Sequence, residues 1–106
     1  MNEAIAKLID TAVAEYSNWL KGSGFYKPES VEKFRNEFSV KNGSKYTKII
    51  RDGSAWAFIV NTDTDKKFRR GDILKSASWA APARNRSRGN IYGEYVVRWT
   101  GPLYLR

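Results

Sequence analysis

The 106-residue chain contains neither cysteine nor histidine. Without these residues it cannot form a disulfide or a zinc site, and it lacks the side chains that bind most transition metals. The same absence excludes catalysis by a Ser-His-Asp triad or a Cys-His pair. The acidic residues are spread over expected helix surfaces and turns, and no pattern indicates that two of them converge for acid–base chemistry. We therefore expect no metal, no cofactor and no catalytic residue, and a binding protein rather than an enzyme.

Long apolar runs are also missing from the sequence. No segment approaches the roughly 18 apolar residues of a membrane span, and the chain does not begin with the basic and then apolar regions of a signal peptide. Small secreted domains usually carry disulfides, so the absence of cysteine favours a reducing environment. These observations predict a cytoplasmic protein with no membrane partner. The chain length predicts a single domain over residues 1–106.

Acidic residues are scarce in the second half of the chain. The net charge at pH 7 is +8, and residues 54–106 carry ten Lys or Arg residues against four Asp or Glu residues. No acidic residue lies between Asp72 and Glu94. A charge excess of this kind raises the rate of encounter with polyanions such as nucleic acids. The alternative is a solvated face that only keeps the protein soluble.

The periodicity of the apolar residues predicts two helices followed by several strands. Apolar side chains recur at spacings of three and four over residues 2–21, and a second helix is expected from Pro28 to the Asn42-Gly43 pair. Alternating patterns after Gly43 predict strands, with a tight hairpin turn at Asp52-Gly53. The expected strands are 45–51, 55–61, 72–77 and 94–100. This order predicts an α+β fold in which two N-terminal helices pack on one face of a three- or four-stranded, mainly antiparallel sheet.

The strand at residues 55–61 is expected at the centre of the sheet, because both of its faces are apolar. The two-residue period of a strand predicts that Trp56, Phe58 and Val60 share one face. The first helix is expected to pack over the sheet through Ile5, Leu8, Tyr16 or Trp19.

The segment 71–91 is predicted to be a strand followed by a fixed loop. Trp79 stands among small residues near Pro82, which predicts a buried anchor; the alternative is an exposed ring that stacks on a base. Three arginines then follow at alternate positions. They cannot all be buried, because guanidinium groups are rarely hidden without a partner.

These arginines and the basic residues of the preceding hairpin form the one candidate site in the sequence. Arginine binds phosphate through paired hydrogen bonds, and asparagine can read the edge of a base. The alternative is that the arginines pair with helix carboxylates such as Glu29, Glu32 or Glu37. The residues predicted to bind nucleic acid or another anion are Lys66, Lys67, Arg69, Arg70, Lys75, Arg84, Arg86, Arg88 and Asn90.

Part of the sequence, about residues 45–91, also carries a resemblance to a known group of proteins. The motifs concerned are Ser54-Ala55-Trp56-Ala57-Phe58-Ile59, Gly71-Asp72-Ile73-Leu74-Lys75, Ala77-Ser78-Trp79, Pro82-Ala83 and Arg88-Gly89-Asn90. Their series resembles a family of small proteins of tailed bacteriophages. That family has no assigned function, so the resemblance implies no site. It implies a phage protein that acts in the cytoplasm of a bacterial host.

The sequence supports two hypotheses about function. The first is a non-enzymatic module that binds nucleic acid or another phosphate-rich ligand, such as a small phosphorylated signal molecule, mainly through its phosphates. The second is a protein-interaction module that binds and inhibits an acidic host protein through the same arginines and exposed Tyr or Trp residues.

Overall fold

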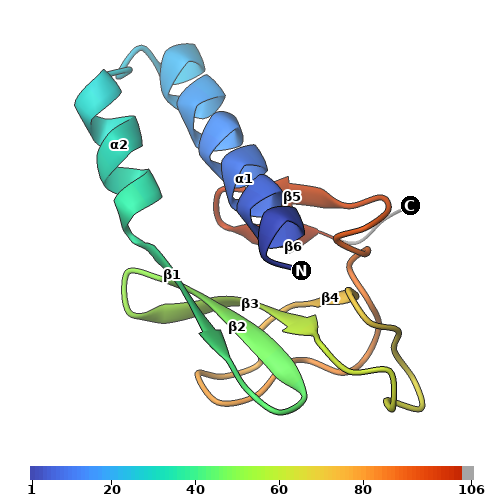
Figure 1. Ribbon diagram of the computed structural model, residues 1–106. Helices are drawn as coiled ribbons and strands as arrows, with labels where there is room; N and C mark the ends of the chain where they lie inside the picture. The colour runs from blue at the N-terminus through green and yellow to red at the C-terminus, as the bar shows by residue number, and fades with distance from the viewer. Residues whose placement is uncertain (104–106) are drawn as a thin grey trace.

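The computed structural model describes residues 1–103 and confirms the α+β fold (Figure 1). A four-stranded antiparallel sheet has the strand order β1-β2-β3-β4, and both helices lie on one side of it. Two further strands, β5 and β6, form a separate antiparallel pair beside α1. The elements are α1 (Asn2–Ser23), α2 (Pro28–Asn36), β1 (Phe38–Asn42), β2 (Tyr46–Arg51), β3 (Ser54–Val60), β4 (Ile73–Leu74), β5 (Val96–Arg98) and β6 (Gly101–Leu103).

The first helix, α1, forms where the periodicity predicts it. Its apolar stripe buries Ile5 and Leu8 in one cluster with Ile49 and Ile59 of the sheet. This confirms that the helix packs over the sheet. The helix ends at Gly24, whose positive φ of 81° lets its backbone N–H bond back to carbonyls of the last turn.

The second helix, α2, packs mainly on α1. Its buried residue Phe34 stacks on Tyr16 at 4.2 Å between ring centroids and meets Phe38 edge-on at 5.3 Å. Trp19 is half exposed and lies 5.1 Å from the ring of Trp99. Tyr16 and Trp19 therefore join the helices to each other and to the β5–β6 pair, whereas the residues near the start of α1 contact the sheet.

The hairpin of β2 and β3 has the turn that its sequence predicts. Asp52 and Gly53 both have positive φ angles, of 50° and 80°, as a two-residue type I′ turn requires. The turn aligns β2 with β3, and β3 lies between β2 and β4 with apolar clusters on both faces. The predicted central position of this strand is therefore confirmed.

A bulge in β3 overturns the predicted alternation of its side chains. The register of β2 against β3 shifts between Ile49 and Ile50, so that Trp56 is an extra residue in the ladder. Trp56 consequently packs in the cluster under α1, whereas Phe58 and Val60 pack on the opposite face. The prediction that these three residues share a face is wrong, because one inserted residue breaks the two-residue period.

The second helix is shorter than predicted. It ends at Asn36, and residues 38–42 form β1, which pairs with β2. Phe34 and Phe38 are four residues apart, which suits a helix, but Phe38 belongs to the strand. The Asn42-Gly43 pair precedes a hairpin turn as readily as it ends a helix. The pairing of β1 with β2 decides in favour of the hairpin turn, and local spacing does not reveal that pairing.

The strands near the C-terminus also differ from the prediction. The expected strand 72–77 pairs in the sheet only as Ile73–Leu74. The expected strand 94–100 forms a strand only as Val96–Arg98, with Tyr95 in an isolated bridge to Gly89. Gly101-Pro102, a pair of residue types that usually ends a strand, begins β6. Pro102 is tolerated there because β6 belongs to a two-stranded ribbon, where one side of each strand needs no ladder partner.

Candidate functional site

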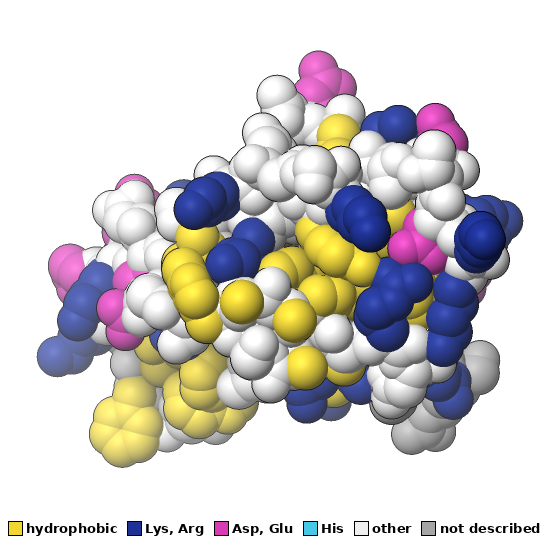
Figure 2. Space-filling model, turned by 90° about the horizontal axis from the view of Figure 1, so that it is seen from below, with side chains coloured by type: hydrophobic (Ala, Val, Ile, Leu, Met, Phe, Trp, Pro, Cys, Tyr) yellow, Lys and Arg dark blue, Asp and Glu magenta, His cyan; other side chains and the backbone are white. Residues whose placement is uncertain are grey.

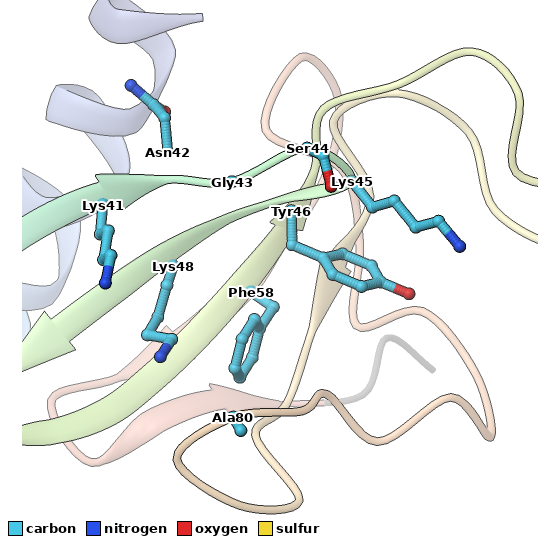
Figure 3. Close-up of a pocket in the computed structure, with 9 residues that line it drawn as sticks. All are labelled: Lys41, Asn42, Gly43, Ser44, Lys45, Tyr46, Lys48, Phe58 and Ala80. Atoms are coloured by element: carbon cyan, nitrogen blue, oxygen red, sulfur yellow. The ribbon is translucent and has the colours of Figure 1, made fainter.

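The face of the sheet that points away from the helices carries a groove. Figure 2 views this side of the molecule and shows apolar side chains at the centre of the face, with Lys and Arg side chains around them. The groove has a volume of about 310 Å³. We call it the lysine groove; its lining residues are Lys41, Asn42, Gly43, Ser44, Lys45, Tyr46, Lys48, Phe58 and Ala80 (Figure 3).

Strand register places two of the lysines side by side. Lys41 of β1 pairs with Lys48 of β2, and Lys48 pairs in turn with Phe58 of β3. Figure 3 shows these three side chains on one side of the sheet. Like charges directly opposite each other destabilise a sheet. An anion bound between the two ammonium groups would therefore relieve a repulsion that the fold itself contains.

The lining of the lysine groove is cationic at its rim and apolar at its floor. Lys45 adds a third ammonium group beside the β1–β2 turn, and none of the lining residues is acidic. The floor includes the ring of Phe58, which is buried and lies 5.7 Å from Nζ of Lys48. The groove can therefore hold a ligand that combines negative charge with an apolar or aromatic part.

The loop over residues 75–83 passes beneath this face and carries Trp79 near its tip. Backbone hydrogen bonds between residues 75–78 and 81–83 hold the loop in a hairpin shape. The side chain of Trp79 is 51% exposed, and Nζ of Lys48 lies 3.8 Å from its ring centroid. The prediction that Trp79 is a buried anchor is wrong, because its small neighbours serve a tight turn and do not enclose the indole.

An ion pair lies beside the lysine groove, next to Tyr46. The guanidinium of Arg84 donates to both carboxylate oxygens of Asp65, at 2.9 and 3.1 Å, and also to Oη of Tyr46. The carboxylate accepts two further hydrogen bonds, from the backbone N–H groups of Lys67 and Phe68. The bonds from Arg84, and then those from the backbone, hold the pKa of Asp65 well below its ordinary value. Asp65 in turn raises the pKa of Arg84.

Two of the residues predicted to bind anions therefore lie beside the lysine groove, at this corner. Nζ of Lys67 donates to the backbone carbonyl of Arg84 at 2.6 Å. The carboxylate that pairs with Arg84 belongs to the neighbouring loop, not to the helix residues considered from the sequence. Both cations are thus held in place at the Tyr46 end of the groove.

Two other predicted residues serve contacts within the fold. Arg88 is buried, and its Nη1 donates to the carbonyl of Pro102 at 3.5 Å. The side-chain amide of Asn90 donates to the backbone carbonyl of Arg70 at 2.9 Å and to the carboxylate of Asp72 at 3.0 Å. These contacts connect the end of the arginine segment to β6 and to the start of β4.

The remaining predicted residues are distributed over other parts of the surface. Arg70 pairs with Asp63 at 3.1 Å, which raises the pKa of Arg70 and lowers that of Asp63. Lys75 lines a separate hollow of about 150 Å³. The others are exposed on their loops: Lys66, Arg69 and Arg86. The structure does not bring all the predicted residues onto one surface, and their role in binding stays a prediction.

Sequence reasoning missed Lys41, Lys45 and Lys48. Lys41 was expected on a helix, and its proximity to Lys48 depends on strand pairing rather than on local spacing. One signal was present in the sequence. Tyr46 and Lys48 are two residues apart on an expected strand, so their side chains must lie on the same face of the sheet.

Within residues 1–103, no three acidic side chains come together in a way that could hold a metal ion. Neither α1 nor α2 is long and apolar enough to cross a membrane. The lysine groove is therefore the strongest candidate for a functional site within residues 1–103.

Comparison with known proteins assigns the chain to a family but does not assign it a function. A family of unknown function (DUF7717) matches residues 2–103, so the chain belongs to that family. No curated protein and no solved structure matches the chain. Any function must therefore be argued from the chemistry of the groove.

Proposed function

We propose that this member of a family of unknown function binds nucleic acid through the lysine groove, without catalysing a reaction. The observation that carries the proposal is the opposition of Lys41 and Lys48 on adjacent strands of a groove with no acidic lining residue. Evenly mixed surface charges would keep the protein soluble without gathering lysines in one groove. The uneven distribution supports an anionic ligand.

Phosphate is the anionic group that fits this arrangement best. An ammonium group is a compact charge with three N–H donors, and adjacent strands stand only about 4.8 Å apart, so both lysines can reach the same phosphate or two neighbouring ones. Lys45 lies further along the groove and can contact the next phosphate of a chain. Contacts of this type carry little sequence information, so we expect a weak preference for base sequence.

The place of action that we propose is the cytoplasm of a bacterial host. The resemblance of residues 45–91 to small proteins of tailed bacteriophages supports this proposal, and so does the absence of cysteine from the sequence. Phage and host nucleic acids would then both be available as ligands.

Fluorescence anisotropy titration of a labelled 20-nucleotide single strand, from 50 to 200 mM salt, tests the proposal. Replacing Lys41 and Lys48 with alanine should reduce the slope of log K against log salt by about 1.4, since each phosphate contact to a single strand contributes about 0.7. The matched control replaces Lys7 and Lys33, which are exposed on the helices, and should leave the slope nearly unchanged. Equal slopes for the two double variants would refute the assignment of the groove, and so would no binding by the wild-type protein at 50 mM salt.

A protein partner is the second candidate, and one observation favours it. Trp19, Phe25 and Tyr26 are exposed by 50%, 76% and 41%, and they cluster in sequence around the turn between α1 and α2. Exposed aromatic side chains are typical anchors of protein interfaces. Affinity purification from host lysate, with and without nuclease, distinguishes the two candidates. A single acidic host protein retained after nuclease treatment would favour this second function.

A further inference from the structure

Two further hollows adjoin each other near Trp79, and the second reaches the β5–β6 pair through Gly101 and Pro102. One has a volume of about 320 Å³ and includes Trp79, Ser54 and Ser76 in its lining. The other is the hollow of about 150 Å³ that Lys75 lines, and it shares Ser54 and Ser76 with the first. Because Trp79 lines the first of these hollows and also contacts Lys48 of the lysine groove, its ring stands between the groove and that hollow.

The position of the Trp79 side chain suits stacking with an aromatic ligand. Its loop is braced by backbone hydrogen bonds, so the ring is presented by a defined hairpin. The ammonium of Lys48 lies over one face of the ring at 3.8 Å, and about half of the side-chain surface, 51%, remains exposed. An exposed indole forgoes the stabilisation that burial would give it, unless a ligand covers it.

The pair of Lys48 and Trp79 matches the two parts of a nucleotide. Each nucleotide presents a phosphate and a flat aromatic base a few ångströms apart, and the pair presents a cation over one face of a half-exposed aromatic ring. Base-on-aromatic stacking combined with a cationic groove is the general mode by which proteins bind single strands.

Lysines line both the groove and the second hollow. Lys41, Lys45 and Lys48 line the groove, and Lys75 lines the second hollow. Arg51 also borders that hollow but pairs with Glu37 at 3.1 Å, so Lys75 is the cation that an incoming phosphate meets. Ser54, Ser76 and Ser78 line the hollow beside Trp79.

We infer that the ligand is a single strand of nucleic acid that runs from Lys45 past Trp79 to Lys75, with one base stacked on Trp79. This inference rests on the proposed function and adds the class of nucleic acid and the path that it takes. A duplex keeps its bases inside its own stack, so it cannot place one on the ring; its phosphates would still reach the lysines.

The test compares single-stranded oligothymidylate with a duplex of equal length, by anisotropy at a fixed salt concentration. Trp79→Ala should weaken binding of a 12-nucleotide oligothymidylate by about 5- to 150-fold, the range for loss of one base-aromatic stack. Trp79→Phe should retain most of the affinity, and binding of the duplex should change less than twofold in either variant. Trp19→Ala is the matched control, because Trp19 is exposed to the same degree, 50%, on the helix side of the molecule.

The length of the ligand gives a second readout for Lys75. Wild-type affinity should rise from a 4-nucleotide to a 12-nucleotide oligothymidylate, because only the longer strand spans the ring and reaches Lys75. Lys75→Ala should remove most of the gain with length and leave binding of the 4-nucleotide strand unchanged. A gain with length that is the same in both proteins would overturn the proposed path.

The outcomes separate this inference from the proposed function. If Trp79→Ala weakens the binding of single strand and duplex equally, or changes the binding of neither, the stacking role of Trp79 is wrong. A loss of binding in the Lys41 and Lys48 double variant would still support the lysine groove as the binding site. If Trp79→Ala melts at a much lower temperature than the wild type, the folded Trp79→Phe variant decides the question. Loss of single-strand affinity in Trp79→Phe, with duplex binding retained, would contradict stacking of a base on an aromatic ring at this position. Binding of single strand and duplex that is unaffected by the lysine substitutions would overturn the proposed function itself.

Discussion

Replacing Phe34 with alanine should destabilise the protein more than any other change in α2, because this side chain joins four parts of the fold. Phe34 is 2% exposed; its ring lies 4.2 Å from that of Tyr16, 5.3 Å from Phe38 and 6.4 Å from Trp99. The guanidinium of Arg51 lies over the ring at 4.5 Å. Removal of a buried phenylalanine typically costs about 3–5 kcal/mol in free energy of unfolding. For a domain of this size the melting temperature should fall by about 15–25 °C.

Thermal unfolding followed by circular dichroism measures this effect, and Phe25→Ala is its control. Phe25 is the same residue type, three residues before α2, but it is 76% exposed, so its loss should change the free energy of unfolding by about 0.5 kcal/mol or less. A helix as short as α2 is not stable alone. In Phe34→Ala, amide protons of α2 should therefore exchange with solvent faster than those of α1. Equal melting temperatures of the two variants would refute the packing of α2 described above.

Three further predictions concern the sheet and its loops. Gly53→Ala should lower the free energy of unfolding by about 1–2 kcal/mol, because alanine is strained at the φ of 80° and no neighbouring atom would compensate; an unchanged urea midpoint would contradict the turn geometry. Trp79→Ala should change stability by less than about 1 kcal/mol, since the ring is half exposed; a loss near 3 kcal/mol in chemical denaturation would return Trp79 to the core. Arg84 and two backbone N–H groups lower the pKa of Asp65 in the folded state. The charged carboxylate therefore stabilises the fold at pH values above the unfolded pKa of about 3.9, and this stabilisation is lost as the pH falls through the lower pKa of the folded state. Thermal melts of wild type and Asp65→Asn should therefore differ at pH 7 and converge as the pH falls from about 4 towards 2; a difference independent of pH would show that the charge of Asp65 does not contribute.

The elements determined by local patterns could be predicted from the sequence. The apolar stripe of α1 runs without interruption at spacings of three and four, and it predicts a helix over residues 2–21 that in the structure extends to Ser23. The Asp52-Gly53 pair specifies a turn whose geometry aligns β2 with β3. In both cases the deciding interactions join residues that are close in sequence, so a pattern of residue types is enough to identify them.

The candidate site depends instead on pairing between distant segments. Lys41 meets Lys48 only because residues 38–42 form a strand, and an aromatic spacing of four residues from Phe34 favoured a helix at the same place. Arg84 finds its carboxylate at Asp65, 19 residues earlier in the chain, through a contact between two loops. Neither contact leaves a periodic signal.

The alternate spacing of the arginines was misleading for a related reason. Residues two apart share a face only in an extended strand, but the segment that contains Arg84, Arg86 and Arg88 is irregular. Arg84 consequently lies beside Tyr46, whereas Arg88 is buried against the carbonyl of Pro102. The charge of the segment could be predicted from the sequence; the direction of each side chain could not.

The most direct test of the central claim is to locate the contact surface of a single strand by NMR. A titration of the ¹⁵N-labelled protein with 12-nucleotide oligothymidylate at low salt should shift the backbone amides of residues 41–48 and 78–81 and the indole N–H of Trp79. The amides of α1 and α2, on the other side of the sheet, should stay in place. Shifts confined to the helices, or a spectrum that does not change at any ligand concentration, would contradict the claim that the lysine groove binds nucleic acid.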